Sequence, residues 1–169
     1  MNSASNGTSV VAALGAAAAC EGLRAGAGTF RVLLDLPARA RIGPLAFADL
    51  SRATDLSMRG IVFYAVFGFG GALLTGLTWF VAVRHGAPRT VRRLMALAVV
   101  ASLLVLVFTT QAAPLMWRIG SAPADPVLVA GLLDRFTAWT VARVVCVDIS
   151  FAAVLGALAF LAWPRGRAT

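Results

Sequence analysis

The segment Glu21–Asp35, EGLRAGAGTFRVLLD, lies inside the first long apolar run of the chain. Its charged residues and one glycine recur every three or four positions, at Glu21, Arg24, Gly28, Arg31 and Asp35. On a helix this spacing places all of them in one stripe. Because a charge that faces lipid is costly, we expect the stripe to face protein or a water-filled cavity. The other helices should therefore pack around it, and the four charges, which sum to zero, suit internal pairing.

The composition is that of a membrane protein. The chain of 169 residues is 60% hydrophobic and 13% charged, with a mean hydropathy of +0.86. Its net charge of +8 comes from 15 arginines, since the sequence contains no lysine. We interpret these arginines as residues that flank membrane spans. No basic stripe with interleaved aromatic residues stands outside the apolar runs, so no nucleic-acid partner is expected.

Apolar segments long enough to cross a bilayer occur at about 9–36, 60–83, 94–117 and 136–163. We therefore predict an all-α integral membrane four-helix bundle, with residues 1–169 in a single membrane domain. Pro37 is expected to end the first span, and Pro114 to kink or end the third. Pro44 can start a short helix in the membrane interface between spans one and two, with an ordered loop as the alternative. Asp125 followed by Pro126 predicts a helix cap, with a short lead-in before span four.

The loop Arg84–Arg93 sets the expected topology. It contains four arginines and no acid, a pattern typical of cytoplasmic loops. Four spans then place both termini on the cytoplasmic side of the cell membrane, and Arg165 and Arg167 after the last span agree. The four tryptophans fall near the predicted span ends, as in an interfacial aromatic belt: Trp79, Trp117, Trp139 and Trp163.

Small residues form two ridges at helical spacing. The first contains Gly15, Ala18, Gly22 and Gly26, and the second contains Gly68, Ala72 and Gly76. Such ridges let two membrane helices approach closely. The alternative is that glycine and alanine are simply abundant in these spans.

No cofactor or metal is expected. Cys20 and Cys146 lie in apolar runs without a CxxC motif, which favours buried thiols over a redox or zinc pair. His85 is the only histidine and lies in the arginine-rich loop. Haem, zinc and non-haem iron sites usually need more imidazole or thiolate ligands.

Polar residues from all four predicted spans gather in one half of the membrane. With cytoplasmic termini, Glu21 and Asp148 lie near the midplane, with Arg24 and Arg143 displaced outward. Tyr64, Thr109, Thr110 and Gln111 fall in the outer half. We therefore predict a pocket in the bundle that opens toward the outer leaflet. Arg24 with Asp148, and Glu21 with Arg143, are candidate pairs between helices, and the alternative is that such pairs only lock the bundle.

The start of span four and the end of span three carry a family resemblance. Residues 135–143 read RFTAWTVAR, and residues 109–117 read TTQAAPLMW. The chain resembles the anthrone oxygenase-like family of small four-span membrane proteins. The family pattern in span four is Arg, aromatic, two residues, Trp-His, two residues, Arg. This chain keeps Arg135, Phe136, Trp139 and Arg143, but it has Thr140 at the histidine position. Leu115 lies where the family commonly has an asparagine.

The resemblance implies cofactor-independent oxygenation of an anthrone-type polyketide to a quinone. This chemistry needs a base and donors for the developing oxyanion. The base is then Glu21 or Asp148, and the oxyanion donors are Arg24, Arg143 and Tyr64. Substrate binding is assigned to Tyr64, Thr109, Gln111 and Trp139.

Other classes of function remain open at this stage. The main alternative is a non-enzymatic accessory or assembly membrane protein, and a transporter ranks below both. The expected partners are the lipid bilayer and a small hydrophobic aromatic substrate, and an oligomer is left open.

Overall fold

The computed structural model describes residues 3–162, with side chains from Gly7 onward. Trp163, Arg165 and Arg167, which the sequence places at the end of the chain, lie outside the described residues. Within that range the chain is helical, without a β-strand. The elements in chain order are α1 (Ser3–Phe30), the π-helical turn η1 (Arg31–Asp35), α2 (Leu36–Ile42), α3 (Pro44–Thr54), α4 (Met58–Arg84), α5 (Arg89–Ser121) and α6 (Pro126–Ala162).

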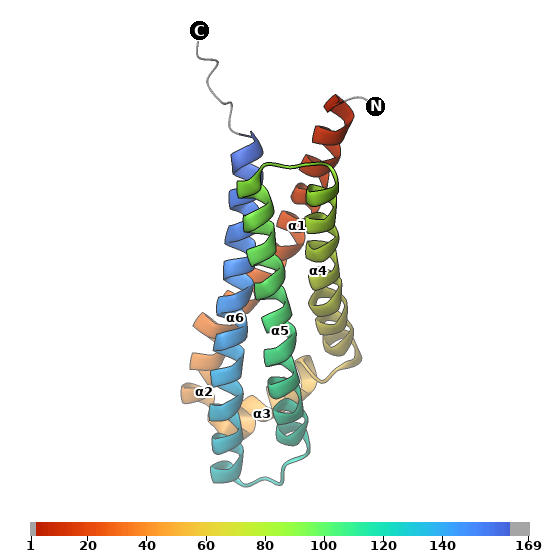
Figure 1. Cartoon of the computed structure of the whole chain (residues 1–169). Helices are drawn as coiled ribbons and strands as arrows, with labels where there is room; N and C mark the ends of the chain where they lie inside the picture. Colours follow the sequence, from red (N-terminus) through yellow and green to blue (C-terminus); the bar gives the residue numbers. More distant parts are fainter. Residues whose placement is uncertain (1–2, 163–169) are drawn as a thin grey trace.

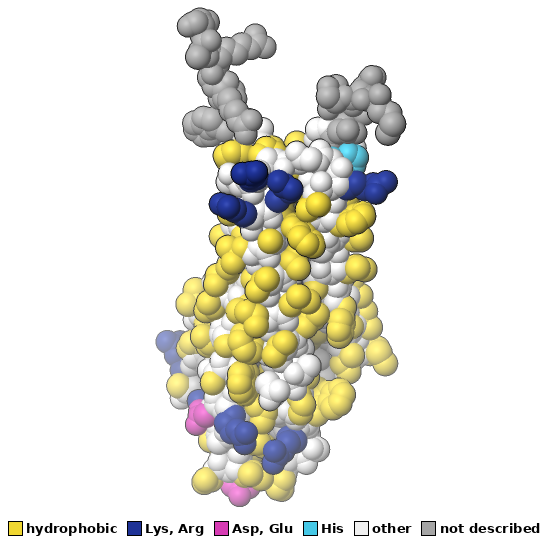
Figure 2. Space-filling view, viewed as in Figure 1, with side chains coloured by type: hydrophobic (Ala, Val, Ile, Leu, Met, Phe, Trp, Pro, Cys, Tyr) yellow, Lys and Arg dark blue, Asp and Glu magenta, His cyan; other side chains and the backbone are white. Residues whose placement is uncertain are grey.

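Four long helices form an upright bundle, with α3 lying across one end (Figure 1). The start of α1, the end of α6 and the α4–α5 connection lie together at the other end. Four segments are long and apolar enough to cross a membrane: Gly7–Ile42, Met58–Arg84, Arg89–Ser121 and Pro126–Ala162. Figure 2 shows a broad apolar band between two belts of arginine. These features confirm the predicted all-α fold with four apolar helices of membrane-crossing length.

The prediction that Pro37 ends the first span is wrong, because the helical path continues to Ile42. The turn η1 ends at Asp35, two residues before the proline, and at its end the Leu36 amide donates to the Arg31 carbonyl. A π-helical turn widens the backbone, and Pro37 occupies the first turn of α2, where its missing amide is tolerated. The helix ends instead at Gly43, whose φ of 84° lies in the left-handed region that favours glycine.

Pro114 does not end the third span either, since α5 continues through it to Ser121. Buried residues on both sides of the proline, such as Ala112 and Met116, pack into one cluster with α6. This packing outweighs the loss of one helical hydrogen bond. The predicted lead-in also merges with span four into the single helix α6. Its cap is as predicted, because Asp125 Oδ1 accepts from the amides of Val127 at 2.9 Å and Leu128 at 3.2 Å.

The helix predicted between the first two spans is α3, and its place in the membrane interface stays a prediction. It buries Phe47, Ala48 and Ser51 against the end of the bundle. Arg52 donates from Nε to the Gly120 carbonyl at 2.8 Å. This carbonyl lies in the last turn of α5, where backbone acceptors lack partners within the helix. The contact therefore fixes α3 to the end of α5.

Two apolar clusters fill the ends of the bundle. One lies at the end with the chain termini and joins α1, α5 and α6 around Leu14, Met95 and Val154. The other lies at the α3 end and joins α3, α5 and α6 around Phe47, Ile119 and Leu133. Between them lies a small apolar cluster with Val105 and Val147. Polar side chains and cavities occupy the rest of this middle layer.

The two small-residue ridges contribute less to helix packing than predicted. In the first ridge, a Cβ at Gly22 would lie 3.1 Å from the Phe151 ring, whereas Gly15 and Gly26 have no neighbour within 4 Å. In the second ridge, Gly68 and Gly76 likewise have none. The close approach of α4 is instead at Gly71, whose buried face also carries Thr75 and Thr78. The second ridge was predicted on the wrong face of α4, because the buried residues of this helix are Gly71, Thr75, Thr78 and Ala82.

We expect Gly71→Leu to destabilise the protein by about 1–3 kcal/mol, as overpacking typically does. A Cβ at Gly71 would lie 2.6 Å from Nη1 of Arg24, and this guanidinium is held by Glu21 and cannot easily withdraw. The matched control is Gly76→Leu, which adds the same side chain in open space and gains helix propensity. Thermal unfolding in detergent measures both. Equal melting temperatures for the two variants would contradict the packing described here.

Candidate functional site

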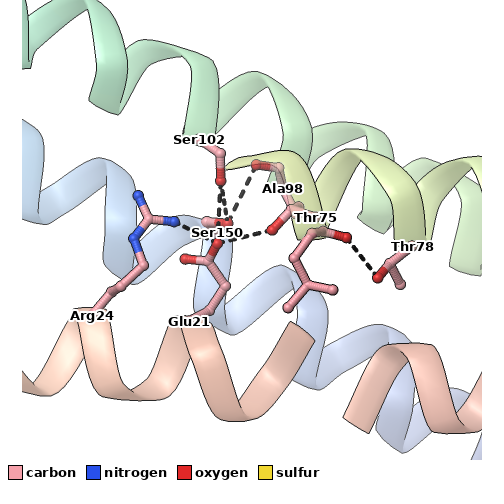
Figure 3. A network of polar contacts seen from close by, with 8 residues as sticks. Glu21, Arg24, Thr75, Thr78, Ala98, Ser102 and Ser150 are labelled. Carbon is pink, nitrogen blue, oxygen red and sulfur yellow. Dashed lines mark hydrogen bonds and ion pairs between the residues drawn. The ribbon is translucent and has the colours of Figure 1, made fainter. Parts of the chain in front are cut away.

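A buried polar network joins the four long helices (Figure 3). At its centre, Glu21 of α1 is 0% exposed. Its Oε1 accepts from Arg24 Nη1 at 2.6 Å, from Thr75 Oγ1 of α4 at 2.9 Å and from Ser102 Oγ of α5 at 3.4 Å. Ser102 and Ser150 of α6 are 3.1 Å apart and share a hydrogen bond. The network therefore holds α1, α4, α5 and α6 together through one carboxylate.

The pairs predicted between helices do not form. Arg24 pairs with Glu21 on its own helix, three residues away, and not with Asp148. Asp148 is exposed, and its nearest polar contact is Thr29 Oγ1 at 3.4 Å. The reason is helical phase, because the inward stripe of α6 passes through Val144, Val147 and Ser150, and Asp148 points away from it.

A second polar cluster lies nearer the α3 end of the bundle. Arg31 of η1 donates to both carboxylate oxygens of Asp55, at 2.6 Å and 2.5 Å. Arg31 Nη1 also donates to the Tyr64 hydroxyl at 2.8 Å, and this hydroxyl donates to Asp55 at 3.0 Å. Asp55 follows α3, and Tyr64 lies in the second turn of α4. The cluster thus connects the first span, the α3–α4 turn and the second span.

The α3–α4 turn fixes the position of Asp55. Ser57 Oγ donates to the Thr54 carbonyl at 2.6 Å and accepts from the Gly60 amide at 3.1 Å. A Cβ at Gly60 would lie 2.3 Å from the Thr54 carbonyl oxygen, so the turn needs glycine there. Asp55 therefore approaches Arg31 from a rigid turn.

Two adjoining cavities occupy the middle layer. The larger, of about 400 Å³, lies between α1, α4, α5 and α6 and is mostly apolar, with Phe63, Phe67 and Val147 in its lining. The smaller, of about 150 Å³, lies toward the α3 end beside Asp55 and Met116. Their linings share polar and small residues: Arg31, Tyr64, Thr109, Ala113 and Arg143. A hydrophobic molecule in either cavity would meet the same polar boundary.

Arg143 is the cation of this boundary that lacks an acidic partner. Its guanidinium lies over the Tyr64 ring, with Cζ 5.7 Å from the ring centre. None of the ion pairs formed by the described residues involves Arg143. The Tyr64 ring stabilises the positive charge of Arg143 less than a carboxylate would. The guanidinium, which lies between helices, therefore still attracts a negatively charged group.

Several predicted site residues do lie together. Arg24, Tyr64, Thr109 and Arg143 all line the larger cavity, as does Thr110. Glu21 is held inside the buried network and does not line either cavity, which leaves it badly placed as a base for a cavity ligand.

Three predicted site residues lie elsewhere. Gln111 is exposed, because it falls one residue beyond the Thr109–Thr110 face of α5. Trp139 packs its ring on Phe108, with the ring centres 5.9 Å apart, and joins the apolar cluster at the α3 end. Asp148 points away from the bundle interior, as described above. None of the three lines either cavity.

Sequence reasoning missed Asp55 as a site residue. Asp55 lies in the connection between spans one and two, and no spacing pattern joins it to Arg31 of the charged stripe. One signal was present in the sequence, because an arginine inside a span needs an acidic partner, and Asp55 lies directly before the second span. The hydrogen-bond partners of Thr75, Ser102 and Ser150 could not be predicted in this way, since hydroxyl residues occur throughout these helices.

The fold and the site define a class of protein, namely a bundle of four apolar helices long enough to cross a membrane, with a mostly apolar cavity beside an arginine that has no acidic partner among the described residues. Within residues 3–162, no three His, Cys, Asp or Glu side chains gather as a metal site would require. Comparison of the chain with protein-family models, curated proteins and solved structures finds no match.

Proposed function

We propose that this protein binds a hydrophobic aromatic small molecule that carries one acidic oxygen. The observation behind the proposal is Arg143, a guanidinium that borders both cavities and has no acidic partner among the described residues. An anionic oxygen beside Arg143 would compensate its charge, and the apolar walls would hold the ring system.

The resemblance to anthrone oxygenases suggests the reaction. Oxygenation of an anthrone converts a ring CH₂ group into a carbonyl, consumes one O₂ and releases one water. The reaction passes through an enolate, which forms when the ring CH₂ group loses a proton to water, and the negative charge of the enolate lies largely on oxygen. Donors that face this oxygen lower the barrier, and Arg143 and Tyr64 are the candidates for that role. No step of this proposal needs a cofactor.

Purified protein in nanodiscs with 1,8-dihydroxyanthrone under air is expected to produce the anthraquinone with matching oxygen uptake. The rate should exceed that of empty nanodiscs by at least about 100-fold, the usual scale of one catalytic stabilisation. Binding of 1,8-dihydroxyanthraquinone should also exceed that of its dimethyl ether, which lacks the acidic hydroxyls. Binding without turnover would exclude the oxygenase activity and still support the binding function. A protein that shows no binding and no turnover would overturn the proposal.

A second candidate is an accessory subunit of a membrane assembly, and the exposed face of α4 favours it. This helix is the least buried of the four apolar helices, and Val66, Phe69 and Leu73 point outward from it. Lipid covers such a face equally well. Stable co-purification with one larger membrane complex, in the absence of any bound small molecule, would select this function.

We further propose that both termini face the cytoplasm and that α3 lies in the outer membrane interface. The arginine-rich α4–α5 loop supports this orientation. At 37 residues α6 is about 55 Å long, against a hydrocarbon core of about 30 Å, so its Asp125 end would extend beyond the core. Reporter fusions should place Ala87 inside and Ala124 outside. Ala87 on the outer face would reverse the orientation.

A further inference from the structure

The charge of the cavity lining is set by a small number of residues. Three arginines border the cavities, namely Arg24, Arg31 and Arg143. Glu21 pairs with Arg24, and Asp55 pairs with Arg31. Three positive charges and two negative charges leave one positive charge in excess, and geometry assigns that excess to Arg143.

Asp55 neutralises the charge of Arg31 in an ion pair that is mostly buried. The two side chains are 12% and 10% exposed, and both guanidinium Nη atoms engage the carboxylate. Such bidentate pairs are strong and geometrically specific. Because the rigid α3–α4 turn holds Asp55 in place, Arg31 cannot turn toward a ligand without leaving this carboxylate buried and unpaired.

We infer that Asp55 determines the charge of the ligand, so that the cavity selects monoanions over dianions. This inference rests on the proposed function and specifies the substrate class of the same site. A monoanion balances the excess charge of Arg143. The second charge of a dianion would lie near Asp55, which repels it, and Arg31 would not be free to compensate it. Without Asp55, both Arg31 and Arg143 would be available, and the lining would accept two negative charges.

The test uses three fluorescent probes that share one ring system and differ in charge: anthracene-2-carboxamide, anthracene-2-carboxylate and anthracene-2,3-dicarboxylate. Binding is measured by fluorescence anisotropy in nanodiscs of zwitterionic lipid. The wild-type protein is expected to bind the monocarboxylate about tenfold more tightly than either other probe. Asp55→Asn should tighten dicarboxylate binding about tenfold and so remove or reverse the preference. Asp49→Asn, which removes the same charge from an exposed ion pair with Arg52, should leave the preference unchanged.

Two further variants keep the test decisive if Asp55→Asn folds poorly. Arg31→Gln with Asp55→Asn has the same net charge as the wild-type lining, so the preference for the monocarboxylate should return. Arg31→Gln alone leaves Asp55 to cancel Arg143, and monocarboxylate binding should fall to the level of the carboxamide. If it does not fall, the inference is wrong.

The outcomes separate this inference from the proposed function. A wild-type protein that binds neither carboxylate better than the carboxamide would overturn the proposed function. A wild-type protein that prefers the monocarboxylate, with the same preference in Asp55→Asn, would overturn only the role of Asp55.

Discussion

Arg24→Leu is expected to abolish most of the folded protein, at a cost of about 3–5 kcal/mol. The substitution leaves the Glu21 carboxylate at 0% exposure, without its cation, in the middle of the bundle. Thr75 and Ser102 can still donate hydrogen bonds to Glu21, but neither supplies a positive charge. Yield from the membrane and thermal unfolding in detergent measure the loss.

The double variant Glu21→Leu with Arg24→Leu is expected to recover part of the lost stability. Removing both charges leaves hydroxyl groups that can form hydrogen bonds with one another, and no buried charge remains without a partner. The double variant should therefore be more stable than Arg24→Leu alone. The matched control is Arg39→Leu, which breaks an ion pair with Asp134 that is far more exposed and should cost about 0–1 kcal/mol. A double variant as unstable as the sum of both single variants would show that Glu21 and Arg24 are not energetic partners.

Arg143→Gln is expected to affect binding and stability in opposite directions. It should weaken binding of anthracene-2-carboxylate about 100-fold, because it removes the unpaired cation beside the cavities. The free protein should become more stable, since an uncompensated charge between membrane helices is costly. Such a gain in stability together with a loss of binding is expected where a charge is retained for function.

The exposed Arg135 supplies the control for this experiment. Arg135→Gln changes the net charge by the same amount on the same helix, but its side chain lines neither cavity. It should leave binding within about twofold, as expected for a charge that contributes mainly at long range. If Arg143→Gln destabilised the protein and left carboxylate binding intact, Arg143 would be a structural residue.

The sequence predicted the class of fold because the controlling signals are local. Apolar length defines the four long helices, and the three- and four-residue spacing places Glu21 and Arg24 on an inward face. Tyr64, Thr109 and Arg143 were predicted from their shared depth, and they do border one cavity. Depth along a span follows from residue number alone, which explains why this part succeeded.

Partner choice could not be read from the sequence in the same way. Depth does not reveal the direction in which a side chain points around its helix, so Asp148 was matched to Arg24 although it faces outward. The π-helical turn before Pro37 also changes the helical phase, and Arg31 at the start of this turn pairs with Asp55 of the α3–α4 turn. The wrong partner for Arg24 and the missed pair of Arg31 with Asp55 have the same cause. Both depend on how the helices lie relative to one another, which the periodicity of the sequence does not record.

Native mass spectrometry tests most directly whether Arg143 holds an acidic molecule in the cavity. Wild-type protein released from nanodiscs should carry an added mass from a small aromatic compound with an acidic oxygen. Arg143→Gln, purified in parallel, should lack this mass, whereas Arg135→Gln should retain it. A wild-type protein without any added mass, or an Arg143→Gln variant that retains the same compound at the same occupancy, would contradict the account.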